Sequence, residues 1–501
     1  MVEEEHEGHP EALHGFEKLR ATRIEKGEAL RAQGVNPYPY RFDVTHTVSR
    51  VRENEKALTE AGTTVRVAGR VMTLRGHGKT AFGHIEDATG RLQFYAKRDD
   101  FGEENYRRFE LAEMGDIIGI AGTVFRTRTE ELTVKLESFE MLAKAIRPLP
   151  EKWHGLTDKE IRYRQRYVDL VVNPEVREVF IKRSRLVENM RRFLLGRGFL
   201  EVETPVLQPL YGGASARPFT THHNALDMTL YLRIANELYL KRLLVGGFER
   251  VFEFSKDFRN EGIDRSHNPE FTMMECYAAY LDYMDYMDMV EEMLKVIALA
   301  VSPDGTVKYG DITLDFTKPW RRVRFFDALR EKTGMEFFGV PEKELAAHAK
   351  KLGVSLEKGG PAPVIIDEVF GATVEPDLQQ PTFIYDYPKE LSPLAKDHRS
   401  VAGLVERFEG YIGGFEVCNA FSELNDPLEQ RRRFEQQMEN RARGDEEAQV
   451  LDEDYLRALE YGMPPAAGLG VGIDRLTMVF TDSHSIRDVI LFPHMRPEDG
   501  R

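Results

Sequence analysis

The chain has 501 residues, of which 42% are hydrophobic, enough for a large core and more than one domain. Its net charge of −15 argues against a generally basic nucleic-acid binder but leaves room for a local phosphate-binding patch. The two cysteines, Cys276 and Cys418, form neither a disulfide framework nor a zinc pattern, which favours a reducing, cytoplasmic location. No apolar run approaches the roughly 20 residues of a membrane helix, so no membrane association is expected.

The N-terminal third predicts a helical extension followed by a small barrel. Residues 1–62 are assigned to the extension, in which residues 11–33 predict a solvent-exposed helix that ends at Gly34. Residues 63–147 contain about five short β-rich segments with one helical interruption, typical of a five-stranded barrel of the oligonucleotide-binding (OB) type. With 14 Lys and Arg against 13 Asp and Glu, this segment is less acidic than the rest, which favours it as an RNA-facing module.

The remainder predicts a larger domain of mixed structure. Residues 148–160 are proline-containing and are predicted as a linker, and residues 161–501 as the second domain. Helical spacing predicts a helix over 179–199. The segments at 250–259 and 270–280 predict neighbouring strands without a long helix between them, which favours an antiparallel sheet flanked by helices. The predicted fold class is therefore α+β.

The stretch FRNEGIDRSHNPEF, residues 258–271, gathers groups that suit a nucleotide. Arg259 and Glu261 would share a face if the preceding strand extends that far. An arginine can grip a phosphate or carboxylate bidentately, His267 could reach a phosphate, and Phe271 could stack on a planar base. Spacing alone nevertheless favours a surface hairpin with a charged tip.

A second group of polar residues follows the alternation of a strand over GFEVCNAFSEL, residues 414–424. Asn419, Phe421 and Glu423 fall on one face and make a plausible pocket for a cationic amine, although a half-buried strand fits the pattern equally well. Glu409 and Glu416 lie just upstream, and their carboxylates are hard oxygen ligands that suit Mg²⁺. Two glutamates at this spacing, taken alone, are usually charged side chains on the protein surface.

Two further segments contain candidate residues. GLGVGIDRLTMVF, residues 468–480, has three glycines before a helix in which Arg475 could reach a triphosphate, although tight packing explains the glycines as well. Glu237 lies in an apolar strand-to-helix passage, where an acid is either functional or stabilises the helix start.

Taken together, three segments resemble the signature motifs of class II aminoacyl-tRNA synthetases. Residues 198–209, with Pro205, resemble motif 1, and residues 258–271 and 468–480 resemble motifs 2 and 3. With the N-terminal barrel, the chain is similar to the subgroup that charges Lys, Asp and Asn. The segments HGLTDKEIRYRQRYVDL, THHNALDMTLYLRIANELYLKRL and NAFSELNDP narrow the resemblance to the lysyl-tRNA synthetases, from about residue 60 to residue 494.

The resemblance implies an ATP-dependent lysine–tRNA ligase. It would activate L-lysine with ATP and transfer it to the 3′ end of tRNA(Lys) in the cytoplasm, using Mg²⁺ and forming a homodimer through motif 1. Arg259 and Arg475 would be catalytic by gripping phosphates. The implied ATP site is Arg259, Glu261, His267, Asn268, Phe271 and Arg475. The implied lysine site is Gly213, Glu237, Arg259, Glu275, Tyr277, Asn419, Phe421 and Glu423. The implied metal ligands are Glu409 and Glu416, and the implied anticodon residues are Phe82, Gln93 and Glu131.

The acids of the implied lysine site distinguish the lysyl-tRNA synthetases from the aspartyl and asparaginyl enzymes of the same subgroup. By the resemblance, Glu275 and Asn419 serve the α-amino end, and Glu237 and Glu423 the side-chain ammonium. An aspartate or asparagine site would not place two acids there. The phosphate-gripping arginines argue against a catalytically silent binding protein, and the barrel argues against a paralogue that lysylates a protein.

One position departs from the pattern of motif 2. Relatives often have arginine immediately before the motif 2 histidine, where this chain has Ser266, with Arg265 one position earlier. The sequence therefore does not assign Arg265 a contact with the γ-phosphate or with the tRNA acceptor.

Overall fold

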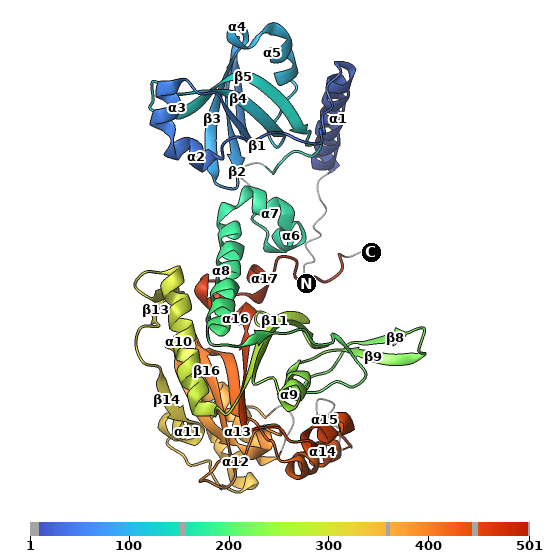
Figure 1. Cartoon of the computed structure of the whole chain (residues 1–501), viewed down its shortest axis with the longest axis vertical. Helices are drawn as coiled ribbons and strands as arrows, with labels where there is room; N and C mark the ends of the chain where they lie inside the picture. Colours follow the sequence, from blue (N-terminus) through green and yellow to red (C-terminus); the bar gives the residue numbers. More distant parts are fainter. Residues whose placement is uncertain (1–9, 151–155, 357–360, 443–448, 499–501) are drawn as a thin grey trace. The chain divides into compact units, whose positions relative to one another are not determined.

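A computed structural model describes residues 10–150, 156–356, 361–442 and 449–498 (Figure 1). The chain divides into two compact units, Met1–Thr157 and Asp158–Arg501. The acidic start and the centre of the predicted linker, residues 1–9 and 151–155, lie outside the described residues. Within the described part, no helix is long and apolar enough to cross a membrane.

The first unit contains the predicted barrel. Its strands are β1 (Val65–His77), β2 (Thr80–Asp87), β3 (Gly90–Lys97), β4 (Ile117–Arg126) and β5 (Leu132–Ala143), which close in the order β1-β2-β3-β5-β4. The helices α4 (Arg98–Phe101) and α5 (Glu103–Phe109) interrupt the strands where the sequence predicted it. Alternating apolar side chains fill the interior, so the OB-type barrel is confirmed.

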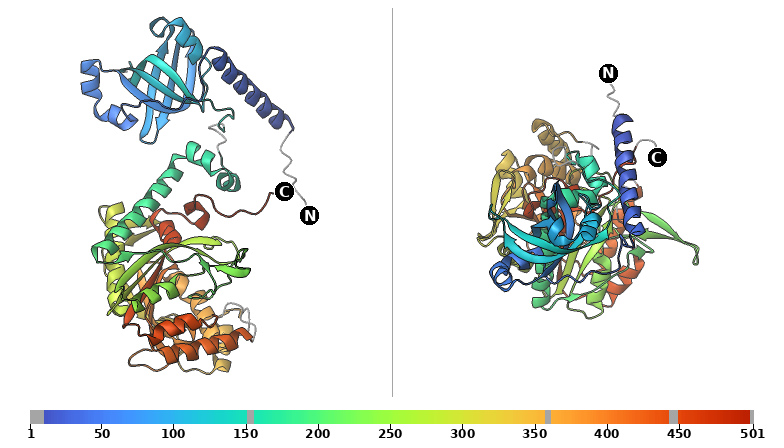
Figure 2. Two further views of the ribbon diagram at one scale, coloured as in Figure 1. Left: turned by 45° about the vertical axis from the view of Figure 1, so that its right-hand side comes forward. Right: turned by 90° about the horizontal axis from the view of Figure 1, so that it is seen from above.

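Three helices precede the barrel: α1 (Pro10–Ala32), α2 (Val48–Glu53) and α3 (Glu55–Ala61). The prediction that the first of them is solvent-exposed was only partly right. Leu30 is fully buried, and the guanidinium of Arg23 donates hydrogen bonds of 3.0 Å to the backbone oxygens of Ala145 and Met114. Helix α1, which Figure 2 shows as a long rod, is thus anchored to the barrel at its C-terminal part, because aliphatic and arginine side chains there cover barrel surface.

The second unit is built on one eight-stranded sheet. Its strands, in spatial order, are β14 (Arg321–Arg324), β15 (Thr382–Pro388), β16 (Leu404–Ile412), β17 (Phe415–Ser422), β18 (Ala466–Gly472), β11 (Glu270–Ala279), β10 (Arg250–Phe258) and β6 (Leu200–Glu201). Neighbours are antiparallel except for the pairs β14–β15 and β6–β10 at the two edges. The predicted antiparallel sheet and α+β class are confirmed.

The two faces of this sheet differ. On one face, α8 (Pro174–Gly196), α10 (Tyr283–Val301) and α16 (Ile473–Phe480) bury a large apolar core, and α10 runs across the strands (Figure 1). On the other, α9 (Glu237–Val245) packs against β10 and β11 and against α15 (Glu453–Glu460). The second face also contains the polar residues of the predicted site.

The remaining elements surround the sheet. They are α6 (Lys159–Arg164), α7 (Arg166–Val172), β7 (Leu207–Gln208), β8 (Thr220–His223), β9 (Met228–Leu232), β12 (Thr306–Tyr309), β13 (Ile312–Asp315), α11 (Phe325–Thr333), α12 (Glu342–Lys351), α13 (Ala362–Thr373), α14 (Pro427–Ala442) and α17 (Ile486–Val489), with single 3₁₀ turns at Glu375–Asp377 and Lys389–Leu391.

Candidate active site

Three adjacent strands place the predicted residues in rows. Across β11, β18 and β17, Glu275 pairs with Gly470, and Gly470 pairs with Asn419. The next row lies two positions further along each strand and consists of Tyr277, Gly468 and Phe421. Because side chains alternate between faces, both rows project to the same side, and the central glycines leave an open floor between them.

The opposite face of the same strands is apolar. Cys276 and Cys418 are free thiols buried in the core beneath the rows. Burial raises the pKa of both thiols, so neither is a reactive thiolate at neutral pH.

A cavity of about 520 Å³ lies over the rows. It is lined by most of the predicted site residues: Gly213, Glu237, Arg259, Glu261, His267, Asn268, Phe271, Glu275, Tyr277, Glu416, Asn419, Phe421 and Arg475. Glu409 and Glu423 are buried and are not among its lining residues, although Glu423 Oε1 lies against Gly468, which is one of them. The lining residues come from four strands, three α-helices and several loops, and they span 273 positions of the chain, from Gly213 to Ile486.

The loop between β10 and β11 forms one side of this cavity. Strand β10 ends at Phe258, so it does not extend far enough for Arg259 and Glu261 to share a strand face; both belong to the loop. The guanidinium carbon of Arg259 lies 4.9 Å from the centroid of the Phe271 ring. Its Nε has no hydrogen-bond partner among the described residues. An arginine held on a ring with a free donor is ready to bind an anion.

Hydrogen bonds tie this loop to helix α16. His267 Nδ1 lies 2.8 Å from Asp264 Oδ2, and its Nε2 lies 3.3 Å from Arg475 Nη2. Burial alone would raise the pKa of Asp264, but bonds from His267 and from the Ser266 amide outweigh it and lower the pKa to about 2. The ionised Asp264 therefore fixes the histidine that faces Arg475.

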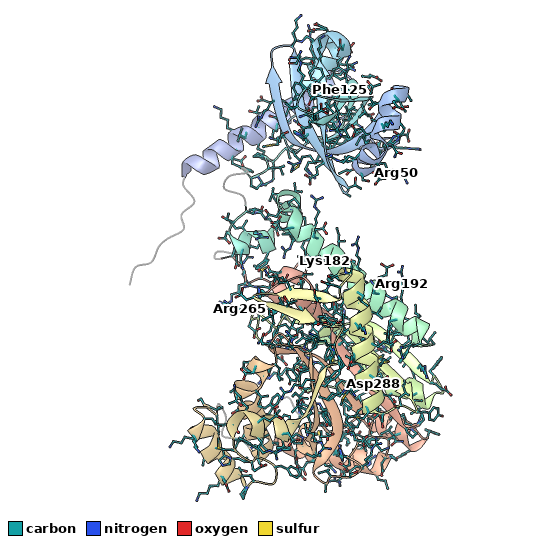
Figure 3. The ribbon with its side chains drawn as sticks, turned by 90° about the vertical axis from the view of Figure 1, so that its left-hand side faces the viewer. Arg50, Phe125, Lys182, Arg192, Arg265 and Asp288 are labelled. Atoms are coloured by element: carbon teal, nitrogen blue, oxygen red, sulfur yellow. The ribbon has the colours of Figure 1, made fainter. Side chains whose placement is uncertain are left out.

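The position that departs from motif 2 also has a definite structure. Ser266 donates from its amide and hydroxyl to Asp264 Oδ1, at 2.7 and 3.1 Å, and it lines the cavity. Arg265 is exposed at the outer edge of the unit (Figure 3), and its carbonyl accepts a 2.7 Å bond from the Ile486 amide. Its side chain does not line the cavity.

The deep end of the cavity is acidic. Glu237 is the first residue of α9 and is buried together with Glu275 and Glu423. Burial raises the pKa of Glu275, and the charges of Asp257 and Glu237 raise it further, while the Tyr277 hydroxyl donates to Glu275 Oε2 at 2.8 Å. Buried acids this close together favour a ligand that brings positive charge.

Two glycines make room at this end. A Cβ at Gly468 would overlap Glu423 Oε1 and the Tyr277 ring, with the Cδ1 atom of that ring only 2.6 Å away. Gly213 has a φ of +88° and a Cβ there would lie 3.1 Å from those of Ala235 and Glu237. Glycine is therefore required at both positions, at Gly468 by space and at Gly213 by backbone conformation as well.

Two charged residues of the site escaped the sequence analysis. Lys241 is fully buried and forms ion pairs with both Glu237 and Glu423. The sequence feature that could have indicated Lys241 is a lysine placed four residues after an acid on an otherwise apolar helix. Arg407 on β16 donates to Asn419 Oδ1 at 3.0 Å and pairs with Glu409. No sequence signal marked it, because its bond to Asn419 is made between two strands, β16 and β17.

The two predicted metal ligands lie in a concentration of negative charge. Glu409 Oε2 accepts hydrogen bonds from Tyr387 at 2.8 Å and Tyr411 at 2.5 Å, and Glu416 Oε2 lies 3.4 Å from Arg475 Nη1. Burial, with the charges of Glu409 and Glu416, raises the pKa of Glu375 to about 7. Carboxylate oxygens suit a hard divalent ion, which would take its other ligands from phosphate and water, because the described residues contain no group of three potential protein ligands.

On the barrel, the three predicted anticodon residues share one face. Phe82 is 40% exposed, and its ring centroid lies 4.6 Å from that of Tyr95. Gln93 Nε2 donates to Glu131 Oε2 at 2.7 Å. Tyr95 in turn contacts Phe125, labelled in Figure 3, at a centroid distance of 6.3 Å. The sequence analysis missed these two flanking rings, which extend the aromatic surface beside the polar pair.

The family models agree with both units. Residues 158–496 match the family of class II tRNA synthetases (D, K and N), and residues 65–142 match the OB-fold nucleic acid binding domain. The chain is therefore a class II tRNA synthetase of the group that includes the aspartate, lysine and asparagine enzymes.

Full-length relatives narrow this assignment. Lysine–tRNA ligase of Carboxydothermus hydrogenoformans is 56% identical over 483 residues, covering 96% of this chain and 99% of the relative. The lysine–tRNA ligases of Moorella thermoacetica and Pelotomaculum thermopropionicum are 54% and 52% identical, each over 96% of this chain and over 98% and 96% of their own length. The chain belongs to the lysine–tRNA ligase family.

Proposed function

We propose that this chain activates L-lysine with ATP to lysyl-adenylate and transfers the lysyl group to the 3′ end of tRNA(Lys) for protein synthesis. The observation that supports this best is a single cavity with arginines on one side and buried acids at its deep end. The arginines suit a triphosphate and a carboxylate, and the acids suit the two amines of lysine.

Within this proposal, each part of lysine and ATP has a partner. Glu275 and Asn419 take the α-amino group, Glu237 and Glu423 take the side-chain ammonium, and Arg259 takes the carboxylate. Gly213, Tyr277 and Phe421 shape the walls around the lysine chain. Phe271 stacks on adenine, and Glu261, His267, Asn268 and Arg475 complete the ATP site. The 4.9 Å contact between Arg259 and Phe271 supports this arrangement, because it holds the guanidinium where nucleotide and amino acid would meet.

The proposed reaction has two steps. A carboxylate oxygen of lysine attacks the α-phosphorus of ATP, the bond to the β-phosphate oxygen breaks, and pyrophosphate leaves with the electron pair. The terminal ribose hydroxyl of the tRNA then attacks the lysyl carbonyl, loses its proton and displaces AMP. The protein supplies position and charge rather than a covalent nucleophile: Arg259 and Arg475 neutralise the phosphate oxygens as charge develops.

Magnesium is part of the proposal as the cofactor of the first step. Glu409 and Glu416 would hold the ion, and the negative charge around them supports this. When bound, Mg²⁺ neutralises phosphate charge and orients the triphosphate.

We infer that the barrel binds the anticodon of tRNA(Lys). Phe82 would stack on a base, while Gln93 and Glu131 would bond to its edge. The exposed Phe82 ring beside a polar pair supports this role.

A homodimer through motif 1 and a cytoplasmic location complete the proposal. In and beside motif 1, Leu200, Val206 and Leu207 are 48%, 39% and 49% exposed, which is unusual for large apolar side chains that lie close together in sequence. A second copy of the chain would cover them. Sedimentation analysis should give twice the chain mass, and Val206→Asp should yield the monomer.

Amino-acid-dependent ATP–pyrophosphate exchange with each of the twenty amino acids tests the function. Lysine should stimulate exchange, and aspartate and asparagine should not. Stimulation by either of these instead would identify an aspartyl- or asparaginyl-type enzyme. A chain silent with all twenty would be a binding protein on a synthetase scaffold. Lysine-dependent exchange without charging of tRNA(Lys) would indicate lysylation of a protein.

A further inference from the structure

The deep end of the cavity contains a cation of the protein itself. Lys241 lies one helical turn after Glu237 on α9, and its side chain is fully buried. Its ammonium forms ion pairs with one oxygen of Glu237 and one of Glu423. The two acids proposed to receive the side-chain ammonium of the substrate thus already share one ammonium.

The surroundings of Lys241 come from four elements besides its own turn. Glu423 follows β17, the Phe421 ring centroid on β17 lies 5.2 Å from Lys241 Nζ, and Tyr455 reaches in from α15. The charge of Glu237 helps to raise the pKa of Glu275 on β11, and the charge of Arg407 on β16 lowers the pKa of Glu237. Burial alone would lower the pKa of Lys241, but Glu237 and Glu423 outweigh it and raise the pKa, so Lys241 stays charged.

Oxygen atoms remain available after these pairings. Glu423 Oε1 is buried and has no hydrogen-bond partner among the described residues. Glu237 lines the cavity, and its Oε2 is the oxygen that faces Gly213, 3.7 Å from a Cβ built there. Each carboxylate therefore has one oxygen committed to Lys241 and a second one left over. A buried acceptor without a donor is costly, which points to a ligand with N–H groups.

Lys241 also offsets part of the negative charge at this end. Glu237, Glu275 and Glu423 would carry three negative charges in this buried space, and Lys241 supplies one positive charge beside two of them. The two ammonium groups of a bound lysine would supply two more, so lysine binding compensates acids that the protein alone leaves partly unpaired.

We propose that Lys241 is a positioning residue for substrate specificity, which orients the carboxylates of Glu237 and Glu423 so that their free oxygens receive the side-chain ammonium of lysine. This inference rests on the proposed function and adds to it the residue that prepares the pocket. Lys241 does not touch the reacting atoms, and it acts through the two acids.

A loss of Lys241 should move the proton that is coupled to lysine binding to higher pH. Burial raises the pKa of Glu423 to about 8, although the charge of Lys241 lowers it, so binding of a substrate ammonium displaces a proton even in the parent enzyme below that pH. Without Lys241 the two buried carboxylates lose their shared cation and hold this proton up to a higher pH. Affinity for lysine therefore rises with pH in both proteins, and it does so at higher pH in the variant.

The test compares Lys241→Met, similar in length but uncharged, with the parent enzyme in lysine-dependent ATP–pyrophosphate exchange. We expect the KM for lysine to rise at least about tenfold at pH 7, with the KM for ATP changed less than about threefold. In both proteins the KM for lysine should fall as the pH rises, and in the variant the midpoint of this fall should lie at least about one pH unit higher. Equal changes in both KM values, or pH profiles with the same midpoint, would overturn the proposal.

A charge-matched double variant covers the case in which Lys241→Met does not fold. Lys241→Met with Glu423→Gln removes one charge of each sign, so it should fold, recover most of the lysine affinity lost by the single variant and lose its pH dependence. If the double variant fails to fold, or folds without this recovery, Lys241 serves the structure only and the inference is wrong.

Lys144 offers a matched control in the other unit. It is fully buried and paired with Asp116 at 2.8 Å and Glu113 at 3.2 Å, far from the cavity in sequence. Lys144→Met should lower the melting temperature and leave the KM for lysine unchanged. A failure of the proposed function can be told apart from a failure of the inference about Lys241, because in the first case the parent enzyme itself would show no lysine-dependent exchange.

Discussion

Gly468 gives the sharpest prediction about the lysine site. In the Gly468→Ala variant the new Cβ would overlap Glu423 Oε1 and would lie 2.6 Å from Cδ1 of Tyr277, where real Cβ contacts stay beyond 3.0 Å. Both partners are almost completely buried, so neither can move away freely. Either the carboxylate or the ring must shift, and both belong to the proposed lysine pocket.

The size of the effect follows from this overlap. Overpacking a well-packed site by one methyl group costs about 1–3 kcal/mol, which corresponds to a rise of about 5- to 150-fold in the KM for lysine. The KM for ATP should change much less, because Gly468 lies in the row of Tyr277 and Phe421, away from Arg259 and Phe271.

The assay is lysine-dependent ATP–pyrophosphate exchange with each substrate varied in turn. Gly470→Ala is a graded comparison, because its Cβ would meet Met273 Sδ at 3.6 Å, an ordinary contact, and a smaller rise is expected. A Gly468→Ala enzyme with unchanged KM for lysine, or with equal increases for lysine and ATP, would refute the reasoning.

Three other predictions concern the remaining parts of the site. Arg259→Lys keeps the charge but loses the planar fork that lies on Phe271, so the exchange rate should fall about 10²- to 10³-fold; a near-normal rate would exclude its catalytic role. Phe82→Ala should raise the KM for tRNA(Lys) in aminoacylation about tenfold, since stacking on a base contributes about 1–3 kcal/mol, and an unchanged value would place the anticodon elsewhere. The pKa of Asp264 is lowered to about 2, below the value of about 3.9 for an unfolded chain, so its bond to His267 contributes above about pH 4 and is lost as the pH falls toward 2. Asp264→Asn should accordingly speed hydrogen exchange in residues 259–269 at pH 7, and equal exchange in both proteins would contradict this.

Much of the fold could be predicted because it depends on local periodicity. Alternating residues identified the barrel strands and β10, β11 and β17, and they placed Asn419 with Phe421 on a common face. A period of two residues needs no knowledge of the neighbouring strand.

Local patterns were insufficient where an element ended or met another part of the chain. Strand β10 stops at Phe258, so Arg259 takes its position from the loop and from the Phe271 ring rather than from strand alternation. Helix α1 is partly buried because Arg23 finds backbone oxygens more than 90 residues away, at Met114 and Ala145. Burial of this kind depends on distant partners, which no local pattern records.

The sequence by itself therefore determined which residue types stand on which face of each strand, and with the motif resemblance it determined the class of enzyme. Only the tertiary structure decided how the charges pair. Glu237 and Glu423 are 186 positions apart and look alike as candidate ligands in the sequence, yet both face Lys241 at the buried end of the cavity. Electrostatic energy in a buried space depends on distances between groups that folding brings together, so the role of Lys241 became visible only in three dimensions.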